Sequence, residues 1–229
     1  MITQETSWHG TVDLKPQQLA ALVADKSPDL TDVAEHLASL YLSYQELFQI
    51  RADLAWAQMC HETNYLRYSG IVPKESNNFA GIGATGEKNP DGTYKYNKFD
   101  NAELGVIAHY AHLAWYVYKD HVHPVFCSKA YDPRHFEVGG RPHRYTGERL
   151  KDLMGWAVPG LTYTKKIAQI ANTIYERPHS AVEKAKNVVL ETIRGLKPVG
   201  SWSYIAIHHS VSDQFNTTVY GLSDRFRGV

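Results

Sequence analysis

The chain is poor in cysteine and in long apolar runs. Only Cys60 and Cys127 occur among 229 residues, which is too few for a disulfide framework and more typical of two buried thiols. No stretch of about 18 apolar residues is present, so we expect no transmembrane segment and no membrane partner. The opening "MITQETSWHG" has neither the basic region nor the apolar region of a secretory signal.

Net charge is also absent, because 24 Lys and Arg balance 24 Asp and Glu. Binding to nucleic-acid phosphates needs positive charge, so the sequence predicts no nucleic-acid partner. Aromatic residues are abundant instead, with 15 Tyr and 5 Trp, and these suit both a buried core and the faces of sugars. The length fits one well-buried core with a small appendage.

Apolar residues recur every three or four positions and predict a mostly helical fold. Helices are expected over residues 29–47, 51–63, 100–118 and 161–176, with a short one over 146–154. "DNAE" (Asp100 to Glu103) is typical of a capping box that opens the third of these helices. Residues 69–98 are rich in Gly, Asn and Pro, and predict a loop with a small β-hairpin in which Asp91 forms the turn.

The stretch "AQMCHETNYLRYSG" places Glu62 in the last turn of an apolar helix, on the same side as Ala55 and Met59. Desolvation and the negative end of the helix dipole both disfavour a carboxylate there. A Glu that stays protonated near neutral pH is the general acid that glycosidic bond cleavage requires. On position alone, a solvated Glu at a frayed helix end is the alternative interpretation.

Three blocks of sequence resemble a known family. "AQMCHET" and "NNFAGIGATG" are similar to the catalytic helix end and the Asn-Asn-Leu-Phe-Gly-Ile-like loop of the peptidoglycan-cleaving glucosaminidases, family 73 of the glycoside hydrolases. "WAVPGLTYTKKI" has the rhythm of the family's Tyr-Ala-Thr-Asp-Pro…Tyr-Ala…Lys-Ile block, with Trp156 in place of the tyrosine and one residue missing. The blocks cover roughly residues 30–176 in family order, and imply a lysozyme-like helical domain with a cleft.

The resemblance also implies roles for individual residues. Glu62 matches the general acid, and Gly81 and Gly83 let the backbone approach a sugar. For Trp156 and Tyr163, which match an aromatic wall, packing in the core is the alternative to sugar contact. The remaining matches are the loop residues that line the cleft floor: Asn77, Asn78 and Phe79.

The second carboxylate is left open by the resemblance. Glu87 is the candidate for a catalytic base or charge stabiliser in the hairpin, with Asp91 as its rival, and neither lies in a matching context. The alternative is that the N-acetyl group of the substrate acts as the nucleophile, a known exception to the two-carboxylate scheme.

Beyond residue 178 the character of the chain changes. The alternating "WSYIAIHHS" predicts a strand and resembles the first strand of zinc-dependent N-acetylmuramoyl-L-alanine amidases, where His208 matches a metal ligand. We therefore expect a catalytic domain over 1–178, a helical linker over 179–198 and an incomplete α/β amidase-like start over 199–229. A catalytic zinc needs three protein ligands, and neither His208 with His209 nor His121 with His123 supplies them, so we predict no metal and no cofactor.

The predicted activity is hydrolysis of β-1,4 bonds between N-acetylglucosamine and N-acetylmuramic acid in peptidoglycan glycan strands, as in a phage or prophage lysin. Without a secretory signal, the protein is expected to be made in the host cytoplasm and to act on the wall, or to act outside the cell. A lytic transglycosylase or muramidase on the same scaffold is one alternative. A cell-wall-binding module without catalysis, favoured by the missing second carboxylate, is another.

Overall fold

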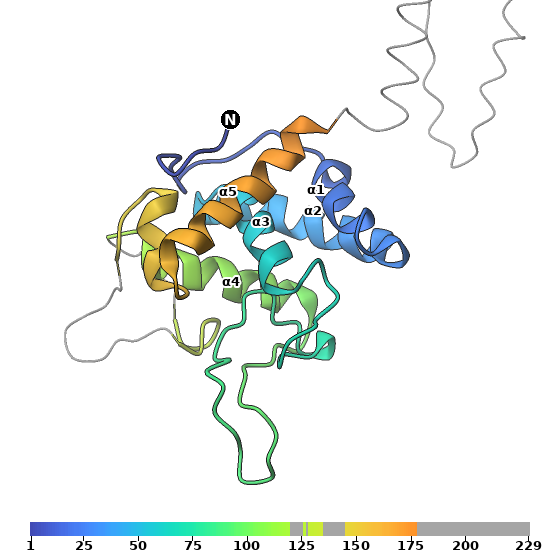
Figure 1. The fold of residues 1–229 in the computed structure, drawn as a ribbon, viewed down its shortest axis with the longest axis vertical. Helices are drawn as coiled ribbons and strands as arrows, with labels where there is room; N and C mark the ends of the chain where they lie inside the picture. The colour runs from blue at the N-terminus through green and yellow to red at the C-terminus, as the bar shows by residue number, and fades with distance from the viewer. Residues whose placement is uncertain (120–125, 127, 135–144, 178–229) are drawn as a thin grey trace, which may run out of the picture. The chain divides into compact units, whose positions relative to one another are not determined.

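The computed structural model describes residues 1–119, 126, 128–134 and 145–177. In this part of the chain, α-helices follow one another with short 3-10 helices between them (Figure 1). The elements are α1 (Pro16–Ala24), η1 (Pro28–Leu30), α2 (Thr31–Phe48), α3 (Ala52–Glu62), η2 (Lys74–Ser76), α4 (Ala102–Val117), η4 (Leu150–Gly155) and α5 (Gly160–Glu176).

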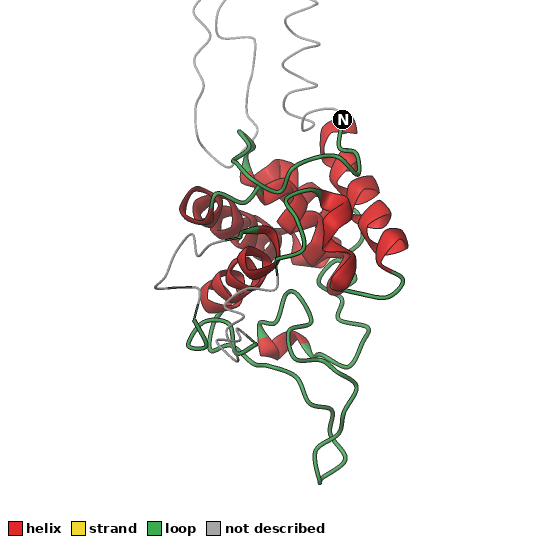
Figure 2. Cartoon of the chain, turned by 90° about the vertical axis from the view of Figure 1, so that its left-hand side faces the viewer, coloured by secondary structure: helices red, strands yellow, loops and turns green. Residues whose placement is uncertain are grey.

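The predicted mostly α, lysozyme-like helical fold is confirmed. Figure 2 shows helices and loops but no strand in the described residues, where β structure is limited to isolated bridges. One bridge pairs Lys88 with Tyr94 and closes the predicted hairpin, whose two sides do not form regular strands. The predicted linker (179–198) and amidase-like fragment (199–229) lie outside the described residues.

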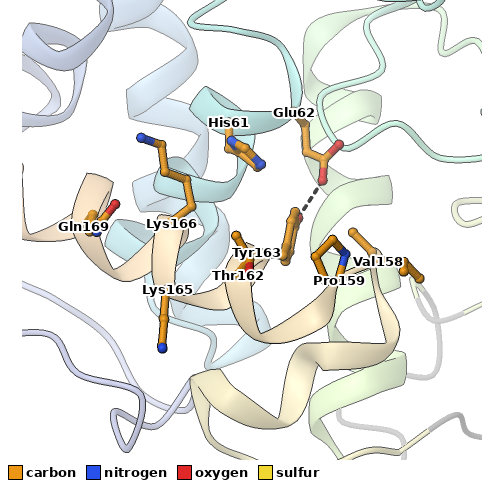
Figure 3. A pocket seen from close by; sticks show the side chains of 10 residues that line it. His61, Glu62, Val158, Pro159, Thr162, Tyr163, Lys165, Lys166 and Gln169 are labelled. Carbon is orange, nitrogen blue, oxygen red and sulfur yellow. Dashed lines mark hydrogen bonds between the residues drawn. The ribbon is translucent and has the colours of Figure 1, made fainter.

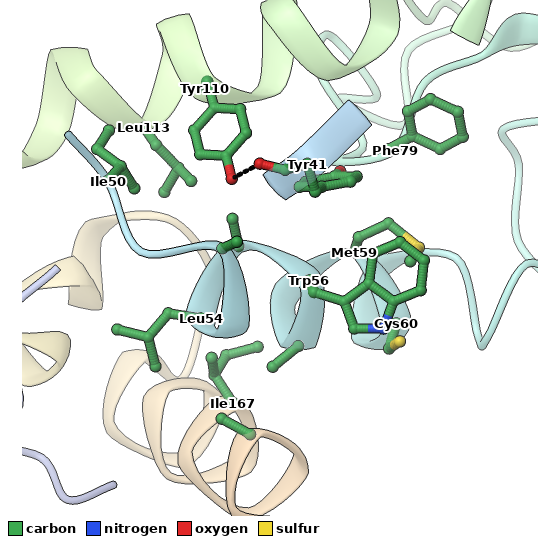
Figure 4. Packing of buried hydrophobic residues seen from close by; sticks show 14 of the residues in the cluster. Tyr41, Ile50, Leu54, Trp56, Met59, Cys60, Phe79, Tyr110, Leu113 and Ile167 are labelled. Carbon is green, nitrogen blue, oxygen red and sulfur yellow. Dashed lines mark hydrogen bonds between the residues drawn. The ribbon is translucent and has the colours of Figure 1, made fainter. Parts of the chain in front are cut away.

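Helix α3 lies at the centre of the core. Every residue from Ala52 to Cys60 is buried, so this helix has no solvent-facing side before its last turn. Figure 4 shows α3 between α4 and α5, with the fully buried Trp56 packed edge-on against Tyr41 at 5.4 Å between ring centroids. Burial of each such large side chain contributes about 1.5–3 kcal/mol. This packing fixes where the helix ends, and it ends at Glu62.

The start of α3 is tied to the end of α5 by a buried carboxylate. Asp53 is fully buried and accepts hydrogen bonds from the Arg51 guanidinium and the Tyr175 hydroxyl, each at 2.7 Å. A buried charge is tolerated only when it is paired and hydrogen-bonded in this way. The contact sets the position of α5 relative to α3.

The predicted capping box at the start of α4 is wrong by one residue. The N-cap is Asn101, whose side chain accepts a hydrogen bond from the Leu104 backbone N–H at 2.9 Å. Glu103 does not reach back to the cap, because its carboxylate accepts a hydrogen bond from the Tyr44 hydroxyl of α2 at 2.7 Å. A tertiary contact therefore takes the carboxylate that the local pattern assigned to the cap.

The loop that follows η2 is held against α4 by a glycine inside that helix. A Cβ atom placed on Gly105 would clash with the Asn77 carbonyl oxygen and would lie 2.9 Å from the Phe79 ring. Glycine in a helix interior costs about 1 kcal/mol relative to alanine. At this position the absence of a side chain allows residues 77–79 to pack directly on α4.

Replacing Gly105 with alanine should lower the melting temperature, although the intrinsic helix propensity favours alanine by about 1 kcal/mol. The added methyl group must displace the loop backbone at Asn77, and we expect loss of the activity proposed below. Thermal unfolding tests this, with Gly155→Ala as the control because its methyl group would meet only ordinary contacts at 3.9 Å. A Gly105→Ala variant as stable as the wild type would contradict the proposed packing role.

Candidate active site

Glu62 is the last residue of α3 and lies half-buried at the edge of the core. Burial raises the pKa of its carboxyl group, while hydrogen bonds from Tyr163 and Trp156 oppose that shift. The direction agrees with the prediction made from its position in the sequence. A carboxyl group with a raised pKa can hold a proton near neutral pH and donate it to a neighbouring oxygen.

The Tyr163 hydroxyl of α5 lies 2.5 Å from Glu62 Oε1 and donates to it (Figure 3). The hydroxyl oxygen of Tyr163 in turn accepts a hydrogen bond at 2.7 Å from Nε2 of Gln58, which lies one turn before Glu62 on α3. Tyr163 itself is 7 % exposed. The tyrosine that the family pattern placed on a sugar-binding wall therefore contacts the acid directly.

Behind Gln58 the hydrogen bonds continue into the core. Gln58 Oε1 lies 3.1 Å from His109 Nε2, and His109 Nδ1 lies 2.7 Å from the Tyr41 hydroxyl. If Gln58 donates to Tyr163, its amide oxygen faces His109, so Nε2 carries the proton and Nδ1 accepts from Tyr41. In this series of hydrogen bonds, each group then donates to the next one in the direction of Glu62.

His109, the histidine in this series of hydrogen bonds, is neutral. Burial lowers the pKa of His109 to about 3, with a further contribution from His112. At neutral pH the core therefore carries no positive charge next to Gln58. A charged imidazolium at that point would favour the ionised form of Glu62.

Gly81 brings the loop backbone next to the other carboxylate oxygen. Its φ is +63°, and a Cβ atom there would lie 3.3 Å from Glu62 Oε2. The positive φ and the close approach both favour glycine. The loop backbone thus approaches Glu62 closely at Gly81, while its predicted approach to a sugar stays a prediction.

The neighbouring loop residues hold the shape of the loop. Asn78 is 1 % exposed; its amide donates to the Ile82 and Asn97 carbonyl oxygens at 2.8 and 3.0 Å. Phe79 is 6 % exposed and belongs to the core, while the half-buried Asn77 donates to the Phe99 carbonyl oxygen at 2.9 Å. These side chains support the loop from inside, and their predicted contact with substrate stays a prediction.

Trp156 forms part of the wall beside Glu62. Its ring packs against His112 at 4.9 Å and against Tyr116 at 5.2 Å between ring centroids, and it is half-buried. It also hydrogen-bonds the Glu62 carboxylate, a contact that the sequence did not predict. Packing and a polar contact with Glu62 are both present, and stacking on a sugar stays a prediction.

A hollow of about 630 Å³ opens beside Glu62, between the end of α3 and the first turns of α5 (Figure 3). Val158 and Pro159 line one part of it, and Lys165 and Lys166 line another. Glu62 contributes the only carboxylate in the lining. The carboxyl group is therefore reachable by a ligand that enters this hollow.

Glu87 takes no part in these contacts and belongs to the segment between η2 and α4, part of which projects from the helices in Figures 1 and 2. Its side chain is 66 % exposed and forms an ion pair with Lys95 at 3.1 Å. The predicted turn role of Asp91 is confirmed, since it accepts hydrogen bonds from the Thr93 N–H and hydroxyl at 2.9 and 2.6 Å. None of the described contacts of Glu62 involves Glu87 or Asp91.

The described residues contain no group of three or more His, Cys, Asp or Glu side chains placed to hold a metal ion. Cys60 is a free, buried thiol, as predicted. None of the helices in this part of the chain combines the length and apolarity of a membrane span. Other predicted candidates lie outside the described residues: His121, His123, Cys127, His208 and His209.

The family model described as mannosyl-glycoprotein endo-β-N-acetylglucosaminidase, the glucosaminidase domain, matches residues 38–176, more than half of the chain. The chain belongs to the glucosaminidase family. The match spans α3, the Gly81 loop and all of α5, so the contacts of Glu62 all lie within the glucosaminidase domain.

A relative supports the same extent of similarity. The chain is 32 % identical over 162 residues to an uncharacterised protein of Borreliella burgdorferi (strain B31), covering 70 % of this chain and 72 % of the relative. No solved structure matches the chain. The glucosaminidase domain makes this protein a glycoside hydrolase and supports hydrolysis of peptidoglycan glycans in general.

Ionisation of Glu62 should be visible in the stability of the protein. Its pKa is raised in the folded state above the ordinary value of 4.5. The protonated group therefore favours folding at low pH, and this contribution is lost as the pH rises through the folded-state pKa. Glu62→Gln cannot ionise, so between about pH 4 and pH 8 its free energy of unfolding should increase relative to that of the wild type.

Chemical denaturation at a series of pH values measures this difference. A difference between Glu62→Gln and the wild type that stays constant over the range would show that Glu62 has the same pKa in the folded and unfolded states.

Removing the Tyr163 hydroxyl should raise the pKa of Glu62 further, because a hydrogen bond to the ionised form is lost. If Glu62 acts in its protonated form, the alkaline limb of the pH–rate profile of Tyr163→Phe should shift to higher pH. Tyr175→Phe is a matched control on the same helix, because its hydroxyl contacts Asp53 instead. Equal profiles for Tyr163→Phe and the wild type would contradict the proposed coupling.

Proposed function

We propose that the protein is an endo-β-N-acetylglucosaminidase that cleaves the β-1,4 bond between N-acetylglucosamine and N-acetylmuramic acid in peptidoglycan, with Glu62 as the general acid. One observation carries the proposal. The Glu62 carboxyl group is desolvated at the end of a buried helix and still lines an open hollow. Membership of the glucosaminidase family supports the class of bond.

In the proposed reaction, protonated Glu62 donates its proton to the glycosidic oxygen as the bond from that oxygen to the sugar C1 breaks. The N-acetyl oxygen of the same sugar attacks C1 and forms a cyclic oxazolinium ion, the substrate-assisted exception to the two-carboxylate scheme. Glu62, now ionised, accepts a proton from water as the water oxygen attacks C1 and opens the ring. The carboxyl group is thereby returned to its protonated state.

Two features favour this route over a base at Glu87. Glu87 is largely exposed, and its carboxylate is paired with Lys95 on the projecting loop. A catalytic group needs firm positioning by packing and hydrogen bonds, which Glu62 has and Glu87 lacks. Glu62 is the one carboxylate in the lining of the hollow. It is held in place by its contacts with Gly81, Tyr163 and Trp156.

The two carboxylates should differ strongly under substitution. Glu62→Gln removes the proton donor while keeping the shape, and we expect a loss of about 10²- to 10⁴-fold in rate. Glu87→Gln is the matched control and should change the rate by less than about threefold, since it removes only an exposed ion pair. A defect in Glu87→Gln comparable to that of Glu62→Gln would replace the substrate-assisted route with a two-carboxylate mechanism.

Mass spectrometry of digested peptidoglycan identifies the bond that is cleaved. The proposed activity gives fragments with a reducing N-acetylglucosamine end, and Glu62→Gln should give none at the same enzyme concentration. Reducing muramic acid ends would indicate a muramidase, and anhydro-muramic ends a lytic transglycosylase. Binding to the wall with no fragments at all would indicate a wall-binding module.

A lytic role outside the cytoplasm, as in a phage or prophage lysin, belongs to the same proposal. Clearing of cell-wall suspensions by the purified wild type, compared with Glu62→Gln, tests whether the cleavage is sufficient to lyse the wall.

A further inference from the structure

Two hollows lie next to each other on the surface beside Glu62. The first, of about 630 Å³, contains Glu62, Lys165 and Lys166 in its lining. The second, of about 430 Å³, contains Lys26, Arg67 and Lys166. Both are lined by His61 and Lys166, so they form one continuous depression that starts at Glu62. Figure 3 shows Lys165 and Lys166 projecting from the α5 side of the first hollow.

The charge in this depression is one-sided. Its four cationic side chains are exposed, and none forms an ion pair with a carboxylate among the described residues. Some other surface cations, including Lys95, Arg149 and Lys151, are paired with acidic side chains. The cations of the depression are Lys26, Arg67, Lys165 and Lys166.

This excess is local, because the whole chain has no net charge. Lys26 does have an acidic neighbour in sequence, Asp25, but that carboxylate is paired with Arg177. The lining of both hollows together includes a single carboxylate, Glu62. An anion that enters the depression therefore meets uncompensated positive charge.

His61 lines both hollows without adding a full charge. Its ring packs edge-on against Tyr163 at 5.3 Å between centroids. Burial and the nearby Lys166 both lower its pKa, so the imidazole is neutral at neutral pH. The positive charge of the depression therefore comes from lysine and arginine, which stay charged over the working pH range.

The distances fit a short peptide attached to the sugar next to the cleaved bond. Along α5, Lys166 lies three residues beyond Tyr163, which contacts Glu62, and this corresponds to a rise of about 4.5 Å. Ile170, in the second hollow, lies about 10 Å along the helix from Tyr163. Two or three extended residues span about 7–10 Å.

We propose that this depression binds the carboxylates of the peptidoglycan stem peptide, so that the enzyme recognises the peptide as well as the glycan. The inference rests on the proposed function, which places the glycan at Glu62. The glycan chain is uncharged where the lactyl group of muramic acid is amide-linked to the peptide, so the anionic groups near the cleaved bond are those of the peptide. Charge complementarity therefore selects the peptide.

The test compares Lys26→Gln/Arg67→Gln, whose side chains line the second hollow and not the one that contains Glu62, with the wild-type full chain on two substrates. One is peptidoglycan with intact stem peptides, and the other is the same glycan after an amidase has removed the peptides. Each exposed ion pair is worth a few-fold in affinity, so kcat/KM on the intact substrate should fall about five- to tenfold, mainly through KM. On the peptide-free glycan the variant should equal the wild type.

A control variant with the same loss of charge is Lys119→Gln/Lys129→Gln, because both lysines are exposed and neither lines the depression. It should behave as the wild type on both substrates. An equal fall for Lys26→Gln/Arg67→Gln on both substrates would assign these two residues to glycan binding or to folding. No fall on either substrate would remove the proposed peptide site.

A binding experiment separates this inference from the proposed function. A soluble stem tetrapeptide is titrated into the full-length Glu62→Gln variant and followed by NMR or calorimetry. Saturable binding that weakens with added salt, and with amidation of the peptide carboxylates, supports the site even if no substrate is cleaved. No binding of the free peptide, together with normal cleavage of glycan, overturns the peptide site and leaves the proposed function intact.

Discussion

The burial of every residue of α3 from Ala52 to Cys60 is the constraint on which the candidate active site depends. A helix that is packed on all sides cannot slide or rotate without opening cavities in the core, and protein interiors tolerate such voids poorly. Its last residue, Glu62, is therefore held in one place at the boundary of the core. The polar residues inside the same helix, Asp53 and Gln58, must be satisfied by partners from α5 and α4, and those contacts place Tyr163 beside Glu62.

Two opposing effects act on the proton of Glu62. Desolvation favours the protonated form, while hydrogen bonds from Tyr163 and Trp156 favour the ionised form. For a group that donates a proton and later accepts one, both forms have to be accessible, and this balance provides that. Neutral His109 matters here, because a buried cation behind Gln58 would shift the balance toward the carboxylate.

The sequence predicted the features that local patterns determine. These include the main helices, the position of Glu62 at a helix end, its raised pKa and the turn at Asp91. It did not predict the contacts of Tyr163 and Trp156 with Glu62, because these join segments about 100 residues apart, and periodicity says nothing of which segments meet. Packing in the core, the alternative given for Tyr163, is correct for its buried ring. The sequence pattern does not predict what its hydroxyl contacts.

The sequence contains a further indication of tertiary contact at Gly105, which the pattern of apolar residues does not reveal. A glycine inside an apolar helix is unfavourable by propensity, which points to a close approach by another backbone. Here that backbone is the carbonyl of Asn77. The capping box predicted at Asp100 is wrong because a tertiary contact overrides the local pattern. The residues fit the pattern, but the Glu103 carboxylate accepts a hydrogen bond from Tyr44 of α2 instead.

The arrangement of the projecting loop affects which group can act as the nucleophile in the proposed reaction. The loop is closed at its base by Asn78, which joins Ile82 to Asn97, and beyond that point its contacts are a few local hydrogen bonds and an exposed ion pair. A nucleophile on such a loop would have to be ordered during each catalytic cycle, at a cost in conformational entropy. The N-acetyl group of the substrate is already attached to the reacting sugar, so it needs no ordering by the loop. A rigidly held acid paired with a nucleophile from the substrate is therefore the mechanism that requires least from this part of the chain.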